Sequence, residues 1–412
     1  MLKRIKTIHD IVNWGLCVGC GACYFICRQH AIILKDSPTI GIIPSINRKL
    51  CNGCMECVEV CPGLKVEAQN DLKKQSRYYN YNLLIGPTQE IWEGYANDAQ
   101  IHYQASSGGI LTAIALYCLE KENMELVLHT GMSQSEPWKN ETVQSRTKNE
   151  LLSRTGSRYS SSSPCDSLEI IEKSKRPCVF IGKPCDVAAI NKLRKQRPML
   201  DANLGLVLTF FCAGTPNTQG TISLLELMGI KLEDVRSIRY RGCGWPGNFR
   251  VNFNNDSEYK SLKYIDSWDY LQKYRSFRCQ LCADGLGELG DISCGDAWHR
   301  HFDNDNNTGC SLILTRTKRG TEILRKAAQS NYINIIPSEP QKVIEAQSLI
   351  QRRQHVFGRL LAMNILLIPT PHYQGFNLFN SWIKLSIITK IKTIFGTLRR
   401  LIKRGLWHRR FY

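Results

Sequence analysis

The pattern of apolar and polar positions in the middle of the chain predicts strands and helices that follow one another in alternation. Short apolar runs indicate buried strands, and longer stretches with apolar residues every three or four positions indicate helices. We expect strands at Leu126–Thr130, Cys178–Gly182, Leu204–Cys212 and Ser311–Thr315. We expect helices at Ile110–Glu122, Val187–Gln196, Thr218–Met228 and Gly320–Ser330. This order predicts an α/β body with a partly parallel sheet.

The pattern changes on both sides of this body and divides the chain of 412 residues into three parts. We expect a first unit at residues 1–80, the body at 83–340 and a basic helical tail at 341–412, a length that suits two or three folding units. The other expected features are a short hairpin at Ala31–Leu34 and Gly41–Ser45, a polar linker at Lys73–Asn82, further strands at Val235–Arg241 and Phe249–Phe253, and a loop-rich stretch at Cys279–Asn307.

The tail combines a helical apolar pattern with most of the net charge. The formal net charge is +18, and no acidic residue follows Glu345. Twelve basic residues lie beyond it: Arg352, Arg353, Arg359, Lys384, Lys390, Lys392, Arg399, Arg400, Lys403, Arg404, Arg409 and Arg410. The apolar positions with helical spacing are Ile387, Ile391, Ile394, Phe395, Leu398, Leu401 and Ile402. Such a helix predicts either attachment to an anionic membrane surface or packing on the body or a partner.

Several classes of protein do not fit the sequence. The basic excess is concentrated in the tail and no recognition module is present, so we expect no nucleic-acid partner. Val356–Ile368 is the nearest approach to a membrane span, but it holds Arg359 and Asn364 and is too short. Met1–Asp10 is charged and lacks the apolar stretch of a secretion signal. We therefore expect a cytoplasmic protein, with the membrane surface as the alternative that the tail leaves open.

Eight cysteines near the N-terminus repeat one spacing twice. Cys17, Cys20, Cys23 and Cys27 form the first run, and Cys51, Cys54, Cys57 and Cys61 form the second, which Pro62 follows. This spacing is typical of ferredoxins with two [4Fe–4S] clusters, in which the fourth cysteine of each run binds the other cluster. We therefore assign Cys17, Cys20, Cys23 and Cys61 to one cluster, and Cys51, Cys54, Cys57 and Cys27 to the other.

A structural zinc site or a disulfide framework is the alternative for these cysteines. Zinc prefers four ligands in paired C-x2-C knuckles, whereas each run here carries a third and a fourth cysteine at iron–sulfur spacing. Iron–sulfur clusters need reduced thiols, which again indicates the cytosol and no disulfide. Arg28 stands where bacterial ferredoxins usually have proline, but it does not change the number of ligands.

Four of the ten remaining cysteines suggest another metal site. Cys185 and Cys212 follow two expected strands, whose carboxyl ends should meet at one edge of the sheet, and Cys279 and Cys282 form a C-x2-C pair. A third four-cysteine site and ordinary packing both remain open on these grounds. A zinc site of Cys279, Cys282, His299 and His301 is a further alternative with unusual spacing. We interpret the others as packing residues: Cys118, Cys165, Cys178, Cys243, Cys294 and Cys310.

Two glycine- and serine-containing segments are candidates for binding a dinucleotide. Ser106-Ser107-Gly108-Gly109 precedes an expected helix that has Thr112 in its first turn, so it is either a phosphate cradle or an ordinary N-cap. Gly156-Ser157-Arg158-Tyr159 combines an arginine and an aromatic ring with a turn. The G-x-G-x-x-G match at Gly285–Gly290 lacks a preceding strand and a following helix, so we reject it. Nothing indicates a hydrolase or a nucleotidase.

Taken together, these segments resemble the family of the beta subunit of coenzyme F420-reducing hydrogenase and dehydrogenase, over about residues 85–340, joined to a dicluster ferredoxin. The resemblance rests on the two segments above and on Phe180–Asp186, Cys212-Ala213-Gly214, Cys279–Cys282 and Asp291–Trp298. It implies one [4Fe–4S] cluster held by Cys185, Cys212, Cys279 and Cys282. It also implies FAD, bound around Ser106–Gly109, Thr112, Gly156–Tyr159 and the residues Asp291, Gly295 and Asp296.

The chain departs from the family pattern near these expected sites. Asp186 stands where glutamine is frequent, Ala213 where histidine or a similar residue is frequent, and His299 where glycine is common. The resemblance therefore does not identify the substrate of this chain. The same scaffold serves deazaflavin-linked enzymes, chlorophyll-pathway reductases and proteins associated with cell-surface polysaccharide synthesis.

The expected activity is that of an iron–sulfur flavoprotein oxidoreductase. Electrons would pass from a ferredoxin or another redox protein through the clusters to FAD and on to an organic or deazaflavin acceptor, or in reverse. We assign no catalytic residue, although Asp296, His299 and Tyr159 are candidates for a general acid by their proximity to the motifs. The alternative is a non-catalytic electron-transfer subunit that serves a partner enzyme.

Overall fold

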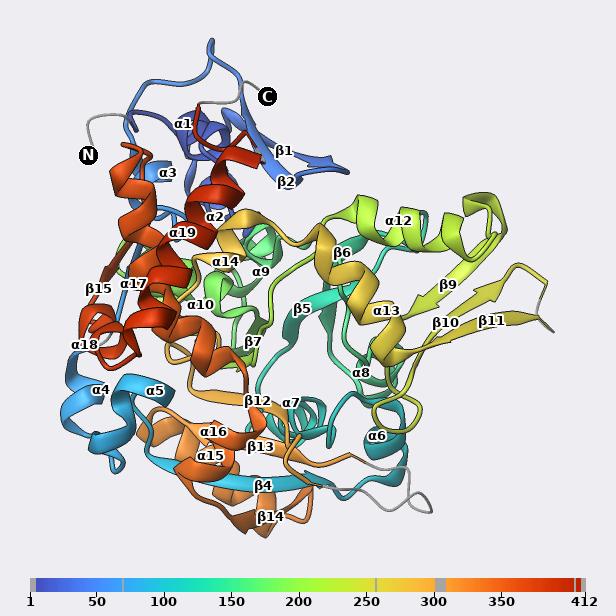
Figure 1. Cartoon of the computed structure of the whole chain (residues 1–412). Coiled ribbons are helices and arrows are strands. Elements are labelled where there is room, and N and C mark those ends of the chain that lie inside the picture. Colours follow the sequence, from blue (N-terminus) through green and yellow to red (C-terminus); the bar gives the residue numbers. More distant parts are fainter. Residues whose placement is uncertain (1–4, 69, 256–257, 301–308, 404, 409–412) are drawn as a thin grey trace.

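A mixed sheet forms the centre of the body in the computed structural model, which describes residues 5–68, 70–255, 258–300, 309–403 and 405–408 (Figure 1). Within these residues the sheet has eight strands in the order β14-β4-β13-β12-β8-β7-β5-β6. Strands β12, β8, β7 and β5 are parallel and the flanking pairs are antiparallel. The strands are β4 (Glu90–Ala96), β5 (Val127–Met132), β6 (Asn140–Ser145), β7 (Cys178–Gly182), β8 (Leu204–Phe210), β12 (Ile292–Asp296), β13 (Ser311–Thr315) and β14 (Ile333–Pro337).

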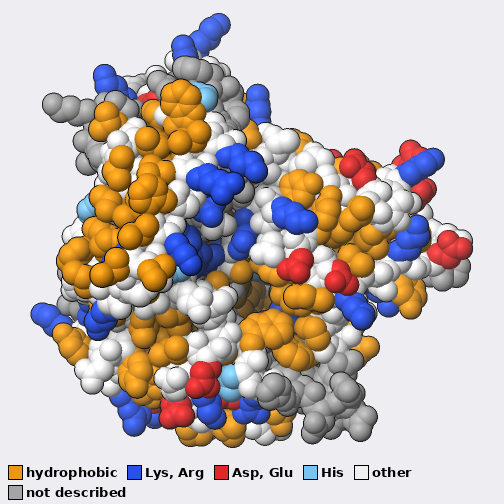
Figure 2. All heavy atoms as spheres, viewed as in Figure 1, with side chains coloured by type: hydrophobic (Ala, Val, Ile, Leu, Met, Phe, Trp, Pro, Cys, Tyr) orange, Lys and Arg blue, Asp and Glu red, His pale blue; other side chains and the backbone are white. Residues whose placement is uncertain are grey.

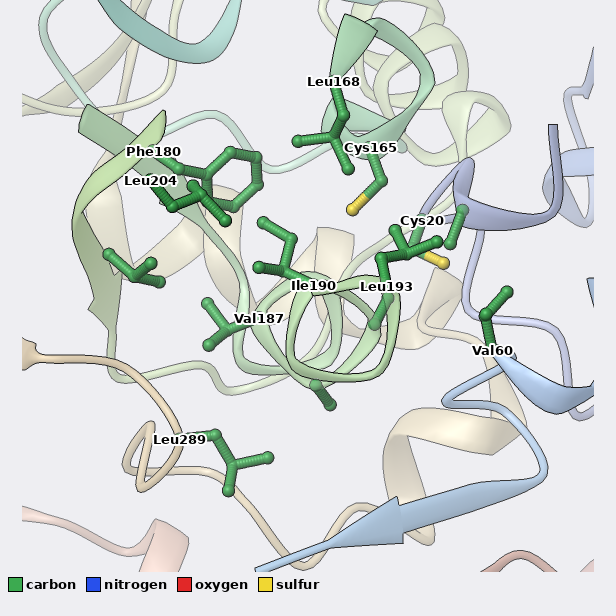
Figure 3. Packing of buried hydrophobic residues seen from close by; sticks show 14 of the residues in the cluster. Cys20, Val60, Cys165, Leu168, Phe180, Val187, Ile190, Leu193, Leu204 and Leu289 are labelled. Carbon is green, nitrogen blue, oxygen red and sulfur yellow. The ribbon is translucent and has the colours of Figure 1, made fainter. Parts of the chain in front are cut away.

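Helices cover both faces of the sheet because its central strands are apolar on both sides. Leu206 and Leu208 of β8 pack in one cluster with α7 (Ile110–Glu120) and α15 (Lys318–Gln329). Leu204 and Val207 of the same strand belong to the other cluster, with α10 (Pro184–Leu193). Figure 3 shows Val187 and Ile190 of α10 on the side of Phe180 and Leu204, and Leu193 on the side of Cys20. The middle of the sheet is therefore a rigid base for the loops at the ends of its strands.

The N-terminal lobe is small and is built onto the body. Its elements are α1 (Ile8–Asn13), α2 (Ala22–Ile26), β1 (Ile32–Ser37), β2 (Gly41–Ile46), α3 (Glu56–Glu59) and β3 (Lys65–Glu67). Cys20 and Val60 of this lobe pack in the same apolar cluster as α10 (Figure 3). The amide of Cys165 donates to the carbonyl of Cys20 at 2.9 Å, and Arg278 donates to the carbonyls of Pro62 and Gly63. These contacts fix the lobe against the end of the sheet where α10 begins.

A three-stranded antiparallel sheet projects from the other side of the body (Figure 1). It consists of β9 (Val235–Arg239), β10 (Asn248–Phe253) and β11 (Tyr259–Lys263), and α12 (Thr218–Leu227) and α13 (Tyr264–Leu271) pack on it. The remaining helices of the body are α4 (Asn70–Lys74), α5 (Asn82–Ile85), α6 (Ala99–Gln104), α8 (Lys148–Ser153), α9 (Glu169–Glu172), α11 (Pro198–Asn203) and α14 (Phe277–Gln280).

The C-terminal segment runs back along the body to the N-terminal lobe (Figure 1). It contains α16 (Pro340–Ala346), α17 (Leu349–Ile365), β15 (His372–Gln374), α18 (Leu378–Ile383) and α19 (Ile387–Lys403). Strand β15 pairs in parallel with β3, and Leu401 of α19 packs in one cluster with Ile8 and Ile11. The tail thus joins the two larger parts. Every helix in the described residues is too short or too polar to cross a lipid bilayer.

Several elements lie within a few residues of where the sequence predicts them. They are the hairpin, the strands at Val127–Met132 and Cys178–Gly182, and the helices α7, α10, α12 and α15. The expectation of a loop-rich stretch over 279–307 is wrong at Ile292–Asp296, because these residues form β12 in the middle of the sheet. His301 of the zinc alternative, and Arg404, Arg409 and Arg410 of the tail, lie outside the described residues.

Candidate iron–sulfur and flavin sites

The N-terminal lobe brings the first predicted set of cysteines together. Cys17, Cys20, Cys23 and Cys61 line one small cavity between α2 and the hairpin. Burial raises the pKa of the Cys17 thiol, and the neighbouring Cys61 and Cys20 add to the effect. The distant cysteine of the second run therefore lies beside the first run, as a four-thiolate cluster site requires.

The second set lies nearer the surface. Burial, together with the neighbouring Cys54, Cys27 and Cys51, raises the pKa of Cys57 to about 11, so these four thiols are neighbours. Cys51 and Cys54 are exposed. The pKa of Cys23 is raised by burial and, among its neighbours, by Cys57, which places the two sets side by side. The outer set is therefore the one of the two that is accessible from the surface of the lobe.

The third set converges from separate elements of the body. Cys185 lies in the first turn of α10, Cys212 follows β8, and Cys279 and Cys282 lie at and just after the end of α14. All four cysteines line one cavity of about 70 Å³. Burial raises the pKa of Cys212 to about 12, and the thiols of Cys279 and Cys282 contribute to this rise. Strand ends and a cysteine pair distant in sequence therefore form a common site.

The zinc alternative does not agree with this geometry. Nε2 of His299 lies 3.3 Å from a carboxylate oxygen of Glu93, and His299 is not among the residues that line the third cysteine cavity. Among the described residues, no three His, Cys, Asp or Glu side chains come together around a single metal ion. A cube of iron and sulfide separates its thiolate ligands more widely than one zinc ion does, so the three cysteine sets suit clusters better.

A buried ion pair lies between the first and third cysteine sets. Nζ of Lys183 is 2.8 Å from Oδ2 of Asp186, and it also donates to the carbonyl and hydroxyl oxygens of Ser162. Burial disfavours the ammonium, but Asp186 and Cys185 raise the pKa of Lys183 above its usual value. Burial raises the pKa of Asp186, and Lys183 opposes this shift. Asp186, which stands where glutamine is frequent in the family, is thus the counter-ion of Lys183.

A cavity of about 1060 Å³ opens beside the third cysteine set. Figure 2 shows a recess in the middle of the face viewed, with Lys and Arg side chains at its rim. Ten of the twelve residues that we predicted to bind FAD line this cavity. They are Ser106, Ser107, Gly109, Thr112, Gly156, Ser157, Arg158, Tyr159, Gly295 and Asp296.

The two predicted binding segments are joined by hydrogen bonds. The amide of Ser157 donates to Oγ of Ser106 at 2.8 Å, and the two hydroxyl groups are 3.0 Å apart. Gly156 has φ of +102°, and a Cβ there would lie 2.9 Å from a guanidinium nitrogen of Arg239. The backbone conformation therefore favours glycine at this turn, and the carbonyl oxygen of Arg241, 3.1 Å from such a Cβ, leaves little room for a side chain.

Gly108 and Asp291 do not line the cavity and have structural roles instead. A Cβ on Gly108 would lie 2.5 Å from the carbonyl oxygen of Gly94, so this glycine allows the turn to approach β4. The carboxylate of Asp291 accepts from the amide of Val207 and the hydroxyl of Thr317. Asp291 thus holds the start of β12 against β8 and the N-terminus of α15.

The wall of the cavity also contains a charged group that the sequence reasoning missed. Arg241 makes two hydrogen bonds to Asp296, of 2.8 and 2.7 Å, and Trp245 donates to the same carboxylate at 2.8 Å. The guanidinium lies over the ring of Tyr264. Asp296 is therefore fully engaged and is not a free general acid, and His299 does not line the cavity. The sequence signal that could have pointed to Arg241 is the stretch from Tyr240 to Gly247, which is rich in glycine and aromatic residues.

Cys243 is a correction to the sequence interpretation. It is exposed, has φ of +58° and lines the large cavity, so it is not a packing residue. Cys118, Cys165, Cys178, Cys294 and Cys310 are buried, as expected. All eighteen cysteines belong to the described residues, and no disulfide joins any of them. Cys165 has an additional contact, because its thiol lies beside that of Cys20.

The lining of the large cavity suits a flavin dinucleotide. The first turn of α7, Ile110–Thr112, faces the cavity, and a helix N-terminus of this kind presents amide groups to phosphates. Arg154 and Arg239 add positive charge, while Trp245, Tyr264, Trp268 and Trp298 provide aromatic surface. The volume is that of a site for a large ligand. Chemistry, charge and size therefore all fit FAD.

The three cavities share walls and form a continuous series. Cys17, Val18 and Gly19 line both the first cysteine cavity and the third. Cys212, Gly214 and Thr215 line both the third cysteine cavity and the large cavity. The third cysteine set thus lies between the candidate flavin site and the N-terminal lobe.

Comparison with known proteins agrees with this geometry. Residues 91–169 and 176–341 match the N-terminal and C-terminal models of the "Coenzyme F420 hydrogenase/dehydrogenase, beta subunit", and residues 16–66 match "4Fe-4S dicluster domain". The coenzyme F420 hydrogenase subunit beta of Methanothermobacter thermautotrophicus is 24% identical over 70% of this chain and 100% of its own length. The coenzyme F420-dependent sulfite reductase of Methanocaldococcus jannaschii is 22% identical over 80% of this chain, which spans only 48% of that protein.

A solved structure shows the same fold. A chain of the F420-reducing [NiFe] hydrogenase complex from Methanosarcina barkeri aligns with a TM-score of 0.52 and 21% identity, over 67% of this chain and 94% of that one. Together with the two adjoining beta-subunit matches, this establishes the relationship that the motifs indicated. The chain belongs to the coenzyme F420 hydrogenase/dehydrogenase beta subunit family and carries a 4Fe-4S dicluster domain at its N-terminus.

Proposed function

We propose that this chain is an iron–sulfur flavoprotein oxidoreductase that relays electrons between three [4Fe–4S] clusters and FAD. The organic or deazaflavin acceptor, or donor in the reverse direction, would react at the large cavity. The observation that carries the proposal is the series of cavities with shared walls, in which Cys17 and Cys212 are the linking thiols. Cofactors placed in this order would form a relay from the surface to the interior.

The residues of the chain supply binding and electrostatics for this relay. The two N-terminal clusters would be held by the predicted sets, and the third by Cys185, Cys212, Cys279 and Cys282. Bound in the large cavity, FAD would exchange single electrons with clusters and a hydride with an organic partner. Arg241 and Asp296 hold each other in the wall, and Ser106 and Ser157 fix the two segments that line the dinucleotide site.

The exposed cysteines of the N-terminal lobe support a proposal for where a protein partner would exchange electrons. Cys51 and Cys54 are exposed, whereas Cys20, Cys23 and Cys61 are buried. A ferredoxin or a partner subunit that contacts this surface would reach the outer cluster first. Among the relatives, several are named as subunits of F420-dependent enzymes. This observation favours, as a second candidate, an electron-transfer subunit without its own organic substrate.

Cofactor content after anaerobic purification tests the proposal. Three clusters predict about twelve irons per chain, and one FAD is expected with them. Cys212→Ala should remove about four irons, whereas Cys118→Ala, at a buried cysteine away from the three sets, should remove none. A wild-type protein with eight irons, or without flavin, would contradict the full assignment.

Reactions of the reduced protein separate the two candidate functions. An oxidoreductase should pass hydride to a deazaflavin or another small acceptor without any other protein present. An electron-transfer subunit should fail with such acceptors and still reduce a co-purified protein. The position of the reaction can be checked with Trp298→Ala, which changes the aromatic wall of the cavity but none of the cysteine sets.

A further inference from the structure

Helix α19 packs on the protein through its small polar side. Thr397 and Leu401 are buried, and a Cβ on Gly358 of α17 would lie 3.0 Å from a methyl carbon of Thr393. The hydroxyls of Thr393 and Thr397 donate within the helix, to the carbonyls of Thr389 and Thr393 at 2.7 Å. The threonine side of the helix can therefore face α17 without unpaired hydroxyl groups, and it allows the two helices to approach closely.

The opposite side of α19 exposes a stripe of large apolar residues. Ile387, Ile391, Phe395 and Ile402 are 73%, 50%, 66% and 61% exposed. Their three- to four-residue periodicity is that of an apolar stripe, which a helix of a globular protein normally turns toward the core. Ile383 at the end of α18 extends the stripe, and Figure 2 shows apolar side chains gathered over α17, α18 and α19. Exposed apolar residues that gather beside polar ones in this way indicate an interaction site.

A row of basic residues runs along one side of this stripe. Lys392, Arg399 and Lys403 are exposed and are seven and four positions apart, which places them on one line of the helix. In the described part of the chain, none of the three forms a salt bridge, and the sequence has no acidic residue after Glu345. The surface therefore combines an apolar stripe with uncompensated positive charge.

We infer that α18 and α19 form a docking surface for an anionic lipid bilayer. An interfacial helix buries its apolar stripe at the boundary of headgroups and acyl chains while its basic residues contact anionic headgroups. A second copy of this chain would bring two such basic rows together, which disfavours self-association. The helix thus lies on the body through one side and presents the other side to the membrane.

The docking surface is connected to the third cysteine set through α17. Arg352 of α17 donates to the carbonyl oxygens of Cys212 and Ala213, and Arg359 donates to that of Gln280. Because α19 packs on α17, attachment of α19 to the membrane would hold the loops that contain Cys212 and Gln280 at a fixed position relative to the bilayer. Truncation of the tail is a poor test, since Phe376, Leu378 and Leu401 belong to the apolar core.

Flotation of the intact holoprotein with vesicles tests the inference. Wild type should float with vesicles of phosphatidylglycerol and phosphatidylcholine in equal parts, and much less with phosphatidylcholine alone. Ile387→Ser/Ile391→Ser/Phe395→Ser and Lys392→Gln/Arg399→Gln/Lys403→Gln should each reduce binding about tenfold or more. Leu227→Ser/Tyr259→Ser, at apolar residues that are exposed elsewhere, should bind like wild type. Iron content should be the same in all four proteins.

Two results would overturn the inference. The first is wild-type protein that does not float with the anionic vesicles. The second is flotation of the triple serine variant to the same extent as wild type. Light scattering identifies the competing occupant: a wild-type dimer that the serine variant dissociates, without vesicle binding, would show that a second copy of the chain covers this surface.

Discussion

Lys183 and Asp186 form an ion pair in the interior, with Nζ 2.8 Å from Oδ2 and both side chains almost fully buried. Removing one partner of such a pair leaves the other charge without compensation. We expect Lys183→Met to destabilise the protein by about 3–5 kcal/mol. The measurement is the shift of the unfolding transition of anaerobically purified protein.

The control for this variant is a lysine in an exposed pair. Lys195 lies 3.2 Å from Glu67 and is 70% exposed, so Lys195→Met should cost no more than about 1 kcal/mol. Lys183→Met/Asp186→Leu should recover part of the loss, because it removes both charges. Equal stability of the two lysine variants would show that the buried pair is not important for folding.

The thiol of Cys165 should tune the potential of the cluster at Cys20. It lies within hydrogen-bonding reach of both Cys20 and the carbonyl oxygen of Asp186, and it lowers the pKa of the Cys20 thiol. A cluster-bound thiolate is the stronger acceptor. Cys165→Ala should therefore make the midpoint potential more negative by about 20–60 mV, the equivalent of a hydrogen bond of about 0.5–1.5 kcal/mol.

A redox titration followed by electron paramagnetic resonance measures this change. Cys178→Ala is the matched control, because Cys178 is also buried and lies at the start of β7, away from the three cysteine sets. Only the Cys165 variant should shift one of the N-terminal signals. An unchanged potential, with the cluster intact, would mean that the thiol donates to Asp186 in the holoprotein as well.

Acid sensitivity should depend on His129, which lines the large cavity. Burial lowers the pKa of His129 to about 4, and Arg154 contributes to the shift; Nε2 lies 2.8 Å from Oγ of Ser145. Between pH 6.5 and pH 4 the unfolded chain binds a proton at this residue and the folded protein does not. Stability is then lost as pH falls, by at most about 1.4 kcal/mol per pH unit from this group.

His129→Gln should flatten this part of the pH profile, since glutamine can still hydrogen-bond to Ser145 but does not titrate. Unfolding transitions measured from pH 7 to pH 5 in both proteins give the comparison. His408, an exposed histidine, provides the control variant His408→Gln, whose profile should follow that of wild type. A slope in the His129 variant as steep as in wild type would assign the acid sensitivity to other groups.

The sequence was most informative where chemistry fixes the spacing of residues. The C-x2-C-x2-C runs determined which distant cysteine lies beside each set, and the structure places Cys61 and Cys27 accordingly. Strand β12 was missed because Ile292–Asp296 contains a glycine and two polar residues and follows a glycine-rich loop, so its burial between β8 and β13 comes from tertiary packing. The role of Arg241 was missed because its partner, Asp296, is 55 residues away.

The turn at Gly156 provides the sharpest test of the proposed flavin site. Gly156→Ala adds a methyl group 2.9 Å from Arg239 at φ of +102°, a conformation that alanine rarely adopts. A strain of about 1–3 kcal/mol should weaken FAD binding about tenfold or more while leaving the iron content unchanged. The control, Gly229→Ala, also has positive φ, but its nearest neighbour is a flexible lysine amine at 4.0 Å. FAD titration of flavin-free protein measures both. If Gly156→Ala binds FAD as tightly as the control, this turn does not belong to the flavin site.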